Sequence, residues 1–476
     1  MFPIAAFLPE SVLLIGALVL FVITLGPSDA RKSGRAALAI AVVTVVAALA
    51  GLGQHAVLFD GAYRVDALSQ FLKLIFAIGF VLVVLLSGGL NDIRQDIRSE
   101  YHLFLLLSLL GFNLLVSSIE LVTLIVSLEL SSFPLFLAVA MRRERDGQRK
   151  QLESAIKYIM FGVAANGIMF FGLSYLFGLT GTTSLPLMAE KLKPVISTPL
   201  AVAGLLMALA GIWYKLAVFP FHFWTPDVYQ GASNETAGLV ASLPKLGAVL
   251  VCYRFMAFCA PDSRVVPMVL AILAGASMLY GNLIAMAQDD FKRLLGFSGI
   301  AHAGYALLGF VALDAAGYGA AFYYMTGYLL MVLACFTVIS RVSKDGENIA
   351  IQDLAGLHRR SPLLAATLLV GVFGLAGIPP LAGFMGKLAL FTAALKQGHL
   401  ALVIFAVLNA AVAVYYYLSV VREAIFKDPG DKGVITLDPA TRILCVVLIV
   451  AVVTLGVVPG PVFNTIGAAL VGPVGR

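Results

Sequence analysis

The chain has 476 residues, of which 61% are hydrophobic and only 12% are charged, and its mean hydropathy is +0.98. A soluble globular protein carries about 25% charged residues and needs polar side chains to cover its surface, so the composition excludes a soluble domain, and with it disordered, collagen-like and disulfide-framework proteins. The four cysteines form no CxxC pair, and the net charge of +6 is spread over short segments, so neither feature indicates a metal site, a redox centre or a nucleic-acid surface.

Apolar runs of about 20 residues follow one another along the chain, and each is long enough to cross a bilayer as a helix. We therefore predict an all-α polytopic membrane protein with about fourteen transmembrane helices. The seventh is interrupted by Pro220 and Pro226 and the twelfth by Pro379-Pro380, so both are expected to be discontinuous. In chain order the spans are 8–26, 36–54, 67–89, 101–118, 120–140, 153–178, 199–219, 236–259, 264–286, 291–312, 316–341, 361–395, 400–425 and 441–465.

The loops between these spans differ in charge. Twenty of the 32 lysine and arginine residues lie in or beside alternate loops on one side, whereas six lie on the other side. Because cytoplasmic loops are enriched in basic residues, the richer side is predicted to be cytoplasmic and both termini periplasmic. The densest basic run, from Arg142 to Lys150, is interpreted as a solvated cytoplasmic loop.

Six further basic residues fall inside predicted spans. Lys73 and Arg254 lie near helix ends, where a long side chain can extend to the lipid head groups. Lys157 lies one turn into the sixth span and is ambiguous. The remaining three lie deep and are considered next.

Lys215, Lys245 and Lys387 lie far inside their spans, and the carboxylate Glu129 lies midway along the fifth. A lysine at mid-membrane costs at least about 2.5–3.5 kcal/mol on insertion scales. Burial favours the neutral form of a lysine and a nearby carboxylate favours the charged form, so these groups could load and release protons. The alternative is a set of static buried ion pairs that fix helix register.

Prolines accompany several of these groups. Pro134 follows the buried glutamate by five residues, Pro220 follows Lys215 by five, and Pro379-Pro380 precede the last deep lysine by seven and eight. A proline frees a backbone carbonyl one turn earlier, and transporters use discontinuous helices to build ion sites near the midplane. The placement favours a functional role for the breaks.

A short internal similarity also spans the chain. The nine residues from Gly211 to Phe219 resemble those from Gly383 to Phe391, 172 residues later. With five helices in each unit, the two copies would be inverted in the membrane, comprising spans 4–8 and 9–13. The predicted segments are 1–100, three N-terminal helices; 101–260, the first five-helix unit; 261–430, the second; and 431–476, a C-terminal helix.

Two histidines could take part in proton transfer. His302 lies about halfway along the tenth span and has a side chain suited to shuttling protons, although a histidine held only by structural hydrogen bonds is an alternative. His222 lies at the break of the seventh span, where exposure to a cavity is plausible. The run from Tyr415 to Tyr417 could stack, bind water or simply pack.

The stretch from Lys215 to Gly231, KLAVFPFHFWTPDVYQG, resembles the seventh-helix signature of the antiporter-like membrane subunits of respiratory complex I, the bacterial proton-translocating NADH–quinone oxidoreductase. Its PDVYQG ending is similar to subunit N rather than to the sister subunits M and L. The resemblance covers roughly 90–430. The other matching motifs are SLEL around Glu129, LPK ending at Lys245, KRLLGFS beginning at Lys292, His302, and GFMGK ending at Lys387.

The resemblance implies a pair, Glu129 with Lys215, whose opening changes lysine protonation, and a hydrated axis that continues along the middle of the membrane. Glu235 departs from the family pattern, because small apolar or proline-rich sequence is expected after Gly231. The implied site residues are Glu129, Lys215, Lys245 and Lys387, with Lys157, His222 and His302 as secondary candidates.

By the same resemblance, the chain is a membrane-arm subunit that couples electron transfer from NADH to quinone in partner subunits to proton translocation. No nucleotide, haem or iron–sulfur motif is visible in the sequence, so NADH, FMN, iron–sulfur clusters and quinone are expected in the partners. Subunits M and K are the expected neighbours, within the bilayer of the bacterial inner membrane. The alternatives are a subunit of a multi-subunit Na⁺/H⁺ antiporter or membrane-bound hydrogenase, and a non-pumping membrane scaffold.

Overall fold

The computed structural model describes residues 4–144, 149–259 and 264–471. Most of the described chain is helical, and among the described residues the only strands are β1 and β2, which pair in one short hairpin. In chain order the elements are η1 (Ile4–Phe7), α1 (Leu8–Thr24), α2 (Ala30–Gly51), β1 (Ala56–Leu58), η2 (Phe59–Gly61), β2 (Tyr63–Val65), α3 (Ala67–Ser87), η3 (Gln95–Ile97), α4 (Arg98–Ser117), α5 (Leu121–Ala140), α6 (Lys150–Thr180), α7 (Leu185–Leu192), α8 (Pro199–Leu216), α9 (Trp224–Gly231), α10 (Asn234–Met256), α11 (Val265–Ala285), α12 (Phe291–Val311), α13 (Ala315–Val342), η4 (Ile351–Leu354), α14 (Leu357–Arg360), α15 (Pro362–Ala376), α16 (Ala382–Lys396), α17 (Leu400–Val421), η5 (Arg422–Phe426), α18 (Pro439–Val457) and α19 (Gly460–Val471).

The predicted fold class is confirmed. Within the described residues, thirteen helices are long and apolar enough to cross a membrane, and the pair α15 and α16 completes a fourteenth crossing. α2 begins earlier than predicted, at Ala30 rather than near 36. The largest difference from the predicted bounds is at the last span, which ends at Val457 rather than near 465 and is followed after Pro459 by a separate helix, α19. Proline lacks the backbone N–H that would continue the helix, so a new helix begins there.

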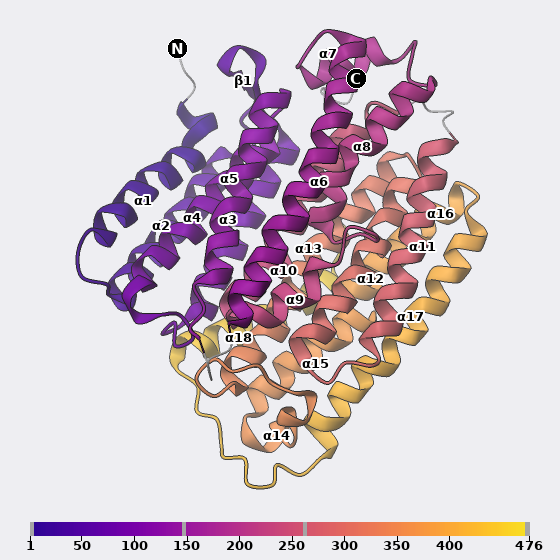
Figure 1. Cartoon of the computed structure of the whole chain (residues 1–476). Coiled ribbons are helices and arrows are strands. Elements are labelled where there is room, and N and C mark those ends of the chain that lie inside the picture. The colour runs from indigo at the N-terminus through magenta and orange to yellow at the C-terminus, as the bar shows by residue number, and fades with distance from the viewer. Residues whose placement is uncertain (1–3, 145–148, 260–263, 472–476) are drawn as a thin grey trace.

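Three helices form the centre of the molecule. α10, α12 and α13 are buried over almost their whole length, whereas only about a third of the residues are buried in α1, α2, α6, α11, α17 and α18. Figure 1 shows the central three crossed and surrounded by the others, with α1–α3 along one flank and α17 along the opposite flank. A helix that is hydrophobic all round and buried all round belongs inside a bundle, and the half-buried helices present their apolar sides outward to lipid or to other subunits.

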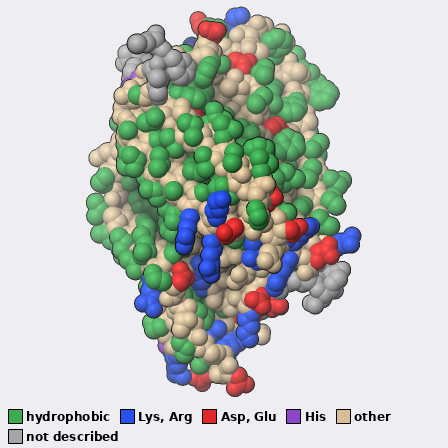
Figure 2. Space-filling model, turned by 90° about the vertical axis from the view of Figure 1, so that its left-hand side faces the viewer, with side chains coloured by type: hydrophobic (Ala, Val, Ile, Leu, Met, Phe, Trp, Pro, Cys, Tyr) green, Lys and Arg blue, Asp and Glu red, His purple; other side chains and the backbone are tan. Residues whose placement is uncertain are grey.

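The two ends of the molecule differ in what they carry. Figure 1 places the beginning and the end of the chain at the end that bears α7, which we name the α7 end, and α14 at the opposite end, the α14 end. Figure 2 shows a broad hydrophobic surface and, toward the α14 end, most of the charged side chains visible on that face. An apolar zone bounded by a charged rim is typical of a membrane-embedded protein.

The two broken helices end in the same way. α8 is followed by Ala217 and α15 by Gly377, and both residues are left-handed, with φ of 65° and 86°. In each case the next amide donates to a carbonyl five positions earlier at 2.9 Å, which closes the helix with a Schellman-type cap. The chain then continues into α9 and α16, and α8 and α15 run in opposite directions in Figure 1.

The positions of these caps show that the short internal sequence similarity does not align the two breaks. Ala217 and Gly377 are 160 residues apart, whereas the sequence match joins residues 172 apart. Lys215 precedes its break and Lys387 follows its break, so the two lysines are not at equivalent places in the two helices. The element order nevertheless supports two five-helix units, because a broken helix is the fourth member of both spans 4–8 and spans 9–13.

Lys73 does not reach toward lipid. Its Nζ lies 2.9 Å from Glu10 Oε1 in α1, and both side chains are 0% exposed. The Tyr63 hydroxyl donates to the same carboxylate oxygen at 2.9 Å, and the Lys73 ammonium lies 5.1 Å from the centre of the Tyr63 ring. The expectation that Lys73 snorkels is therefore wrong, because a buried carboxylate on the neighbouring helix compensates its charge.

We expect the Glu10–Lys73 pair to determine how firmly α1, which packs on α2 and α4, is also linked to α3. Glu10→Gln or Lys73→Met alone leaves one buried charge without its partner, which costs about 3–5 kcal/mol, and the double variant should recover most of that loss. The measurement is the temperature at which the subunit dissociates from the purified membrane complex. Lys193→Met, at an exposed lysine, is the control. Equal dissociation temperatures for all variants would contradict the expectation.

Candidate functional site

Lys215 lies in the last turn of α8, immediately before the break, and its ammonium faces α5. Its Nζ donates to Ser131 Oγ and Ser132 Oγ, both at 2.7 Å, and to the Leu128 carbonyl at 3.2 Å. The side chain is buried, and its Nζ lies 5.9 Å from the centre of the Phe112 ring. All of these contacts are with neutral groups.

Glu129 belongs to the same segment of α5 but has a different partner. Its Oε1 accepts a hydrogen bond of 2.6 Å from Asn166 Nδ2 in α6, and the residue is half-buried. In the described part of the chain no carboxylate lies within 4.0 Å of Lys215. The ion pair that the resemblance implies is therefore open in this structure, because hydroxyl groups hold the lysine and an amide holds the glutamate.

Lys245 lies in the middle of α10 and is completely enclosed. Its Nζ donates to the Gly299 carbonyl of α12 at 3.0 Å and to the Tyr328 hydroxyl of α13 at 3.4 Å, and it lies 5.0 Å from the centre of the Tyr328 ring. Glycine suits position 299, since a Cβ there would lie 2.8 Å from Nζ and 3.0 Å from the tyrosine oxygen and would displace these two groups. This lysine joins all three central helices.

His302 lies one turn farther along α12, at the centre of a tyrosine cluster. Its Nδ1 shares a hydrogen bond with the Tyr324 hydroxyl at 2.6 Å and its Nε2 with the Tyr417 hydroxyl at 3.2 Å. Its ring centre is 4.9 Å from that of Tyr328, which also contacts Lys245, and 6.2 Å from that of Tyr305. The histidine is thus hydrogen-bonded on both sides.

Lys387 lies in α16, after the second break, and reaches back to α15. Its Nζ donates to the carbonyls of Leu375 at 3.1 Å and Ala376 at 2.9 Å, the last two residues of that helix. These carbonyls have no partner within the helix, and they form the negative end of its dipole. The ammonium also lies 4.8 Å from the ring centre of Tyr305, which connects it to the His302 cluster. The broken helix thus supplies the polar contacts of this lysine.

Two of the secondary candidates lie away from the groups described above. Lys157 is partly exposed at the start of α6 and pairs with Glu153 at 2.6 Å and with Asp227 of α9 at 2.7 Å. His222 lies in the first break, stacked among aromatic rings, and within the described residues neither of its ring nitrogens has a hydrogen-bond partner. Lys157 therefore belongs to an ion-pair network at the α14 end, and His222 packs among aromatic rings within the break.

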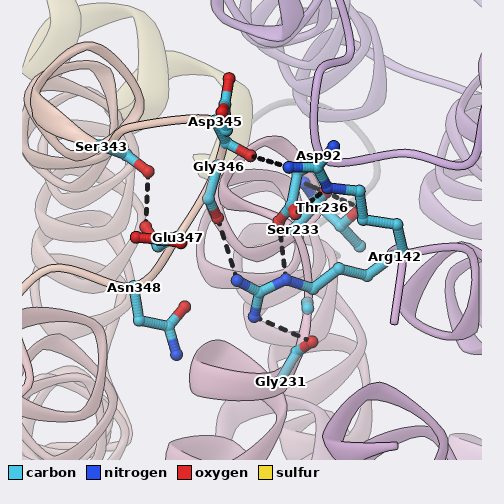
Figure 3. Close-up of polar contacts among 12 residues, drawn as sticks. Asp92, Arg142, Gly231, Ser233, Thr236, Ser343, Asp345, Gly346, Glu347 and Asn348 are labelled. Atoms are coloured by element: carbon cyan, nitrogen blue, oxygen red, sulfur yellow. Dashed lines mark hydrogen bonds and ion pairs between the residues drawn. The ribbon is translucent and has the colours of Figure 1, made fainter. Parts of the chain in front are cut away.

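An arginine at the α14 end binds the end of α9, the helix that follows the first break (Figure 3). Arg142 donates from Nε to Asp92 Oδ2 at 2.6 Å, from Nη1 to the carbonyls of Gln230 at 2.9 Å and Gly231 at 3.3 Å, and from Nη2 to the Gly346 carbonyl at 2.9 Å. We call these five residues the Arg142 clamp. The side chain is only 8% exposed.

The interpretation of Arg142 to Lys150 as a solvated loop is wrong at its first residue. Arg142 is buried because it caps the carbonyl end of α9 and neutralises the buried Asp92. Arg143 and Arg149 are exposed as expected, and 145–148 lie outside the described residues.

Sequence reasoning did not identify several of the residues that contact the candidate lysines, Glu129 and His302. Ser131, Ser132 and Asn166 hold Lys215 and Glu129, and none of them stands out in an apolar span. The sequence does contain a signal for two other contact residues. Tyr324 and Tyr328 are four residues apart and therefore share one face of α13. The other residues that sequence reasoning did not place are Tyr229, Gly299 and Tyr305, whereas Tyr417 belongs to the tyrosine run that the sequence singled out.

Comparison with known proteins agrees with this architecture. Residues 118–413 match the family model described as NADH:quinone oxidoreductase/Mrp antiporter, TM. The chain is 60% identical over 466 residues to NADH-quinone oxidoreductase subunit N 2 of Opitutus terrae, which covers 98% of this chain and 97% of that protein.

Two solved structures show the same fold. A chain of respiratory complex I from Thermus thermophilus with bound aureothin has a TM-score of 0.84 and 32% identity, covering 97% of this chain and 100% of that chain. A chain of the Mrp complex from Dietzia sp. DQ12-45-1b has a TM-score of 0.87 at 21% identity, covering 99% and 98%, which is a likeness of fold alone. The fold therefore does not distinguish the two kinds of complex, and the sequence identity does.

Proposed function

The chain belongs to the family of subunit N of NADH-quinone oxidoreductase, and we propose that it translocates protons through the buried groups described above. It is a membrane-arm subunit of that translocase, and its partners are other subunits of the complex. The proposed axis comprises Glu129, Lys215, Lys245, His302 and Lys387.

One observation carries the proposal. Lys215, Lys245 and Lys387 are buried, and within residues 4–144, 149–259 and 264–471 none has a carboxylate within 4.0 Å. A static ion-pair role would place a carboxylate beside each lysine, because an unpaired buried charge is costly. Neutral hydroxyl and carbonyl partners allow each lysine to exist with or without its extra proton, which is what a relay needs.

The open arrangement of the first pair suggests how the relay is controlled. If Glu129 leaves Asn166 and approaches Lys215, Coulomb attraction stabilises the ammonium and holds a proton on it. When the two separate, as they are here, the buried lysine more readily gives its proton to the next group. Rearrangement in partner subunits would set the position of Glu129, which is half-buried at the side of the molecule.

The finer features of this function are proposals as well. We place the α14 end in the cytoplasm and both chain termini on the periplasmic side of a bacterial inner membrane, because most basic loop residues belong to the α14 end. Subunits M and K are the proposed neighbours. We propose that NADH, FMN, the iron–sulfur clusters and quinone bind in partner subunits.

The function is tested by replacing both members of the first pair in the assembled complex. Glu129→Gln and Lys215→Ala should each lower proton uptake into vesicles at least about tenfold, because each removes a proton-transfer or control group. Proton uptake and NADH oxidation are measured together, with subunit content as the check on assembly. Lys191→Ala, at an exposed lysine of α7, is the control. Normal uptake per NADH with an intact complex would overturn the proposal and leave the scaffold alternative.

A further inference from the structure

An unusual carboxylate lies at the beginning of α10. Glu235 is the second residue of this helix, it is only 6% exposed, and its Oε2 has no hydrogen-bond partner among the described residues. The neighbouring Ser233 already caps the helix, since its Oγ accepts from the Thr236 amide at 3.3 Å and contacts the Thr236 hydroxyl at 2.9 Å. Capping therefore does not explain why an acidic side chain is buried there.

Two other polar atoms close by in the chain share this property. Within the described part of the chain, Asn234 Oδ1 and the Tyr229 hydroxyl are buried and have no hydrogen-bond partner. Buried polar groups are almost always bonded to protein or to ordered water, and an unbonded one costs about 1–3 kcal/mol. The Asn234 and Glu235 oxygens both lie at the start of α10, next to the end of α9, and indicate a place for ordered water there.

Glu235 is aligned with Lys245 along one face of α10. Glu235, Gly238, Ser242 and Lys245 follow the spacing i, i+3, i+7 and i+10, which places them on one stripe. That stripe faces α13, because a Cβ on Gly238 would lie 3.3 Å from Phe336 Cβ and Lys245 contacts the Tyr328 hydroxyl two turns away. At 1.5 Å per residue, the two charged positions are about 15 Å apart along the helix.

Tyr229 lies in the interval between them. Its ring centre is 6.0 Å from that of Phe336, which is the residue opposite Gly238. Its hydroxyl lies 3.7 Å from the position that a Cβ on Gly299 would occupy, and Lys245 Nζ lies 2.8 Å from the same position. Tyr229 thus begins beside the Glu235 end of the stripe and brings an unpartnered hydroxyl close to the Lys245 ammonium.

The charged and polar side chains around Glu235 come from four parts of the chain and are also buried. Lys292, at the start of α12, donates to the Ala232 carbonyl at 2.8 Å, and its charge acts on Glu235, as does that of Asp92. Tyr101 of α4 bonds to the Thr236 hydroxyl at 3.1 Å. Figure 3 shows Ser233 and Thr236 beside Asp92 and the Arg142 side chain. The carboxylate therefore sits just inside the charged α14 end.

We propose that Glu235 collects protons at the α14 end and delivers them to Lys245 by way of Tyr229, a role that rests on the proposed function. A proton from the cytoplasmic side binds the Glu235 carboxylate and then passes through ordered water to the Tyr229 oxygen. Tyr229 gives its own hydroxyl proton to neutral Lys245, which becomes an ammonium, and the carboxylate and phenol return to their starting states. No bond other than those to hydrogen changes.

The test compares variants in the assembled complex reconstituted in vesicles. Glu235→Gln and Tyr229→Phe should each slow proton uptake at least about tenfold, because each removes a proton-transfer group without changing its shape. Glu235→Asp, which keeps the carboxyl group, should retain part of the uptake. Glu100→Gln is the matched control, since Glu100 lies in the first turn of α4 and also has a carboxylate oxygen without a hydrogen-bond partner.

A second readout reports the carboxyl group itself. Infrared difference spectra of the wild-type complex during turnover should contain the C=O band of a buried carboxylic acid, and this band should disappear in Glu235→Gln and shift in Glu235→Asp. The band's absence from the wild-type spectra, or its persistence in Glu235→Gln, would overturn the inference. Lys245→Met separates the two proposals. Normal uptake in Glu235→Gln with impaired uptake in Lys245→Met overturns this inference alone, whereas normal uptake in Lys245→Met overturns the proposed function.

Discussion

Replacing Lys387 by methionine should abolish proton pumping while the complex still assembles. The ammonium contacts two carbonyls at the end of α15 and a tyrosine ring, and methionine has nearly the same length and no proton to carry. Losing the two hydrogen bonds costs about 1–3 kcal/mol, which is small compared with the packing of α16 in the bundle. The measurements are proton uptake by vesicles and the subunit content of the purified complex.

Lys387→Arg distinguishes a proton carrier from a structural charge. Arginine keeps the positive charge, and its guanidinium can bond to the α15 carbonyls and stack on Tyr305, but it does not deprotonate in proteins. Pumping should therefore be lost in this variant too, and Lys396→Met, on the exposed end of the same helix, should pump normally. Restoration of pumping by arginine would show that only the charge matters.

The sequence alone was sufficient for the framework of the fold. The length of the apolar runs determines the fourteen crossings, since a helix needs about 20 apolar residues to span the bilayer. The prolines determine the two breaks, because α8 ends just before Pro220 and α15 ends just before Pro379-Pro380. These are local properties of the chain, and local properties can be deduced from sequence.

The partners of the charged groups could not be deduced in this way. A lysine near a helix end looks the same in the sequence whether it reaches toward lipid or pairs with a carboxylate, and only the position of α1 in the folded bundle brings Glu10 to Lys73. Glu129 and Lys215 were expected to be in contact, yet neighbouring serine and asparagine side chains hold them apart. Which contact forms depends on side-chain geometry across helices, and residue spacing carries no information about it.

The Arg142 clamp holds the end of α9 in place. The carbonyls of Gln230, Gly231 and Ala232 at the end of α9 are capped by the cations Arg142 and Lys292, the latter at 2.8 Å, and the amide of Asn348 also donates to Gln230 at 2.9 Å. Capping by cations is favourable at a helix C-terminus because it satisfies free carbonyls and opposes the helix dipole. We therefore expect any movement around the first break to take place on the side of α8, where Lys215 lies.

We accordingly expect Arg142→Ala to cause the largest structural loss of any single replacement at the α14 end. It leaves Asp92 without its 2.6 Å guanidinium partner and removes a cap from three carbonyls, and removal of one member of a buried pair alone costs about 3–5 kcal/mol. Arg142→Lys should lie between this variant and wild type, because an ammonium is a single point donor and cannot bridge all of these acceptors.

Hydrogen–deuterium exchange of the amides in 224–231, measured in membrane preparations of each variant, reports this loss directly. Exchange should increase strongly in Arg142→Ala and moderately in Arg142→Lys, and the yield of assembled complex should fall in the same order. Arg143→Ala is the matched control, because the Arg143 side chain is 39% exposed and its Nε lies as far as 4.0 Å from Asp92 Oδ1. Such a contact is worth about 0–1 kcal/mol. If exchange in 224–231 is the same in Arg142→Ala and wild type, then the clamp does not hold α9, and the break is free to move from either side.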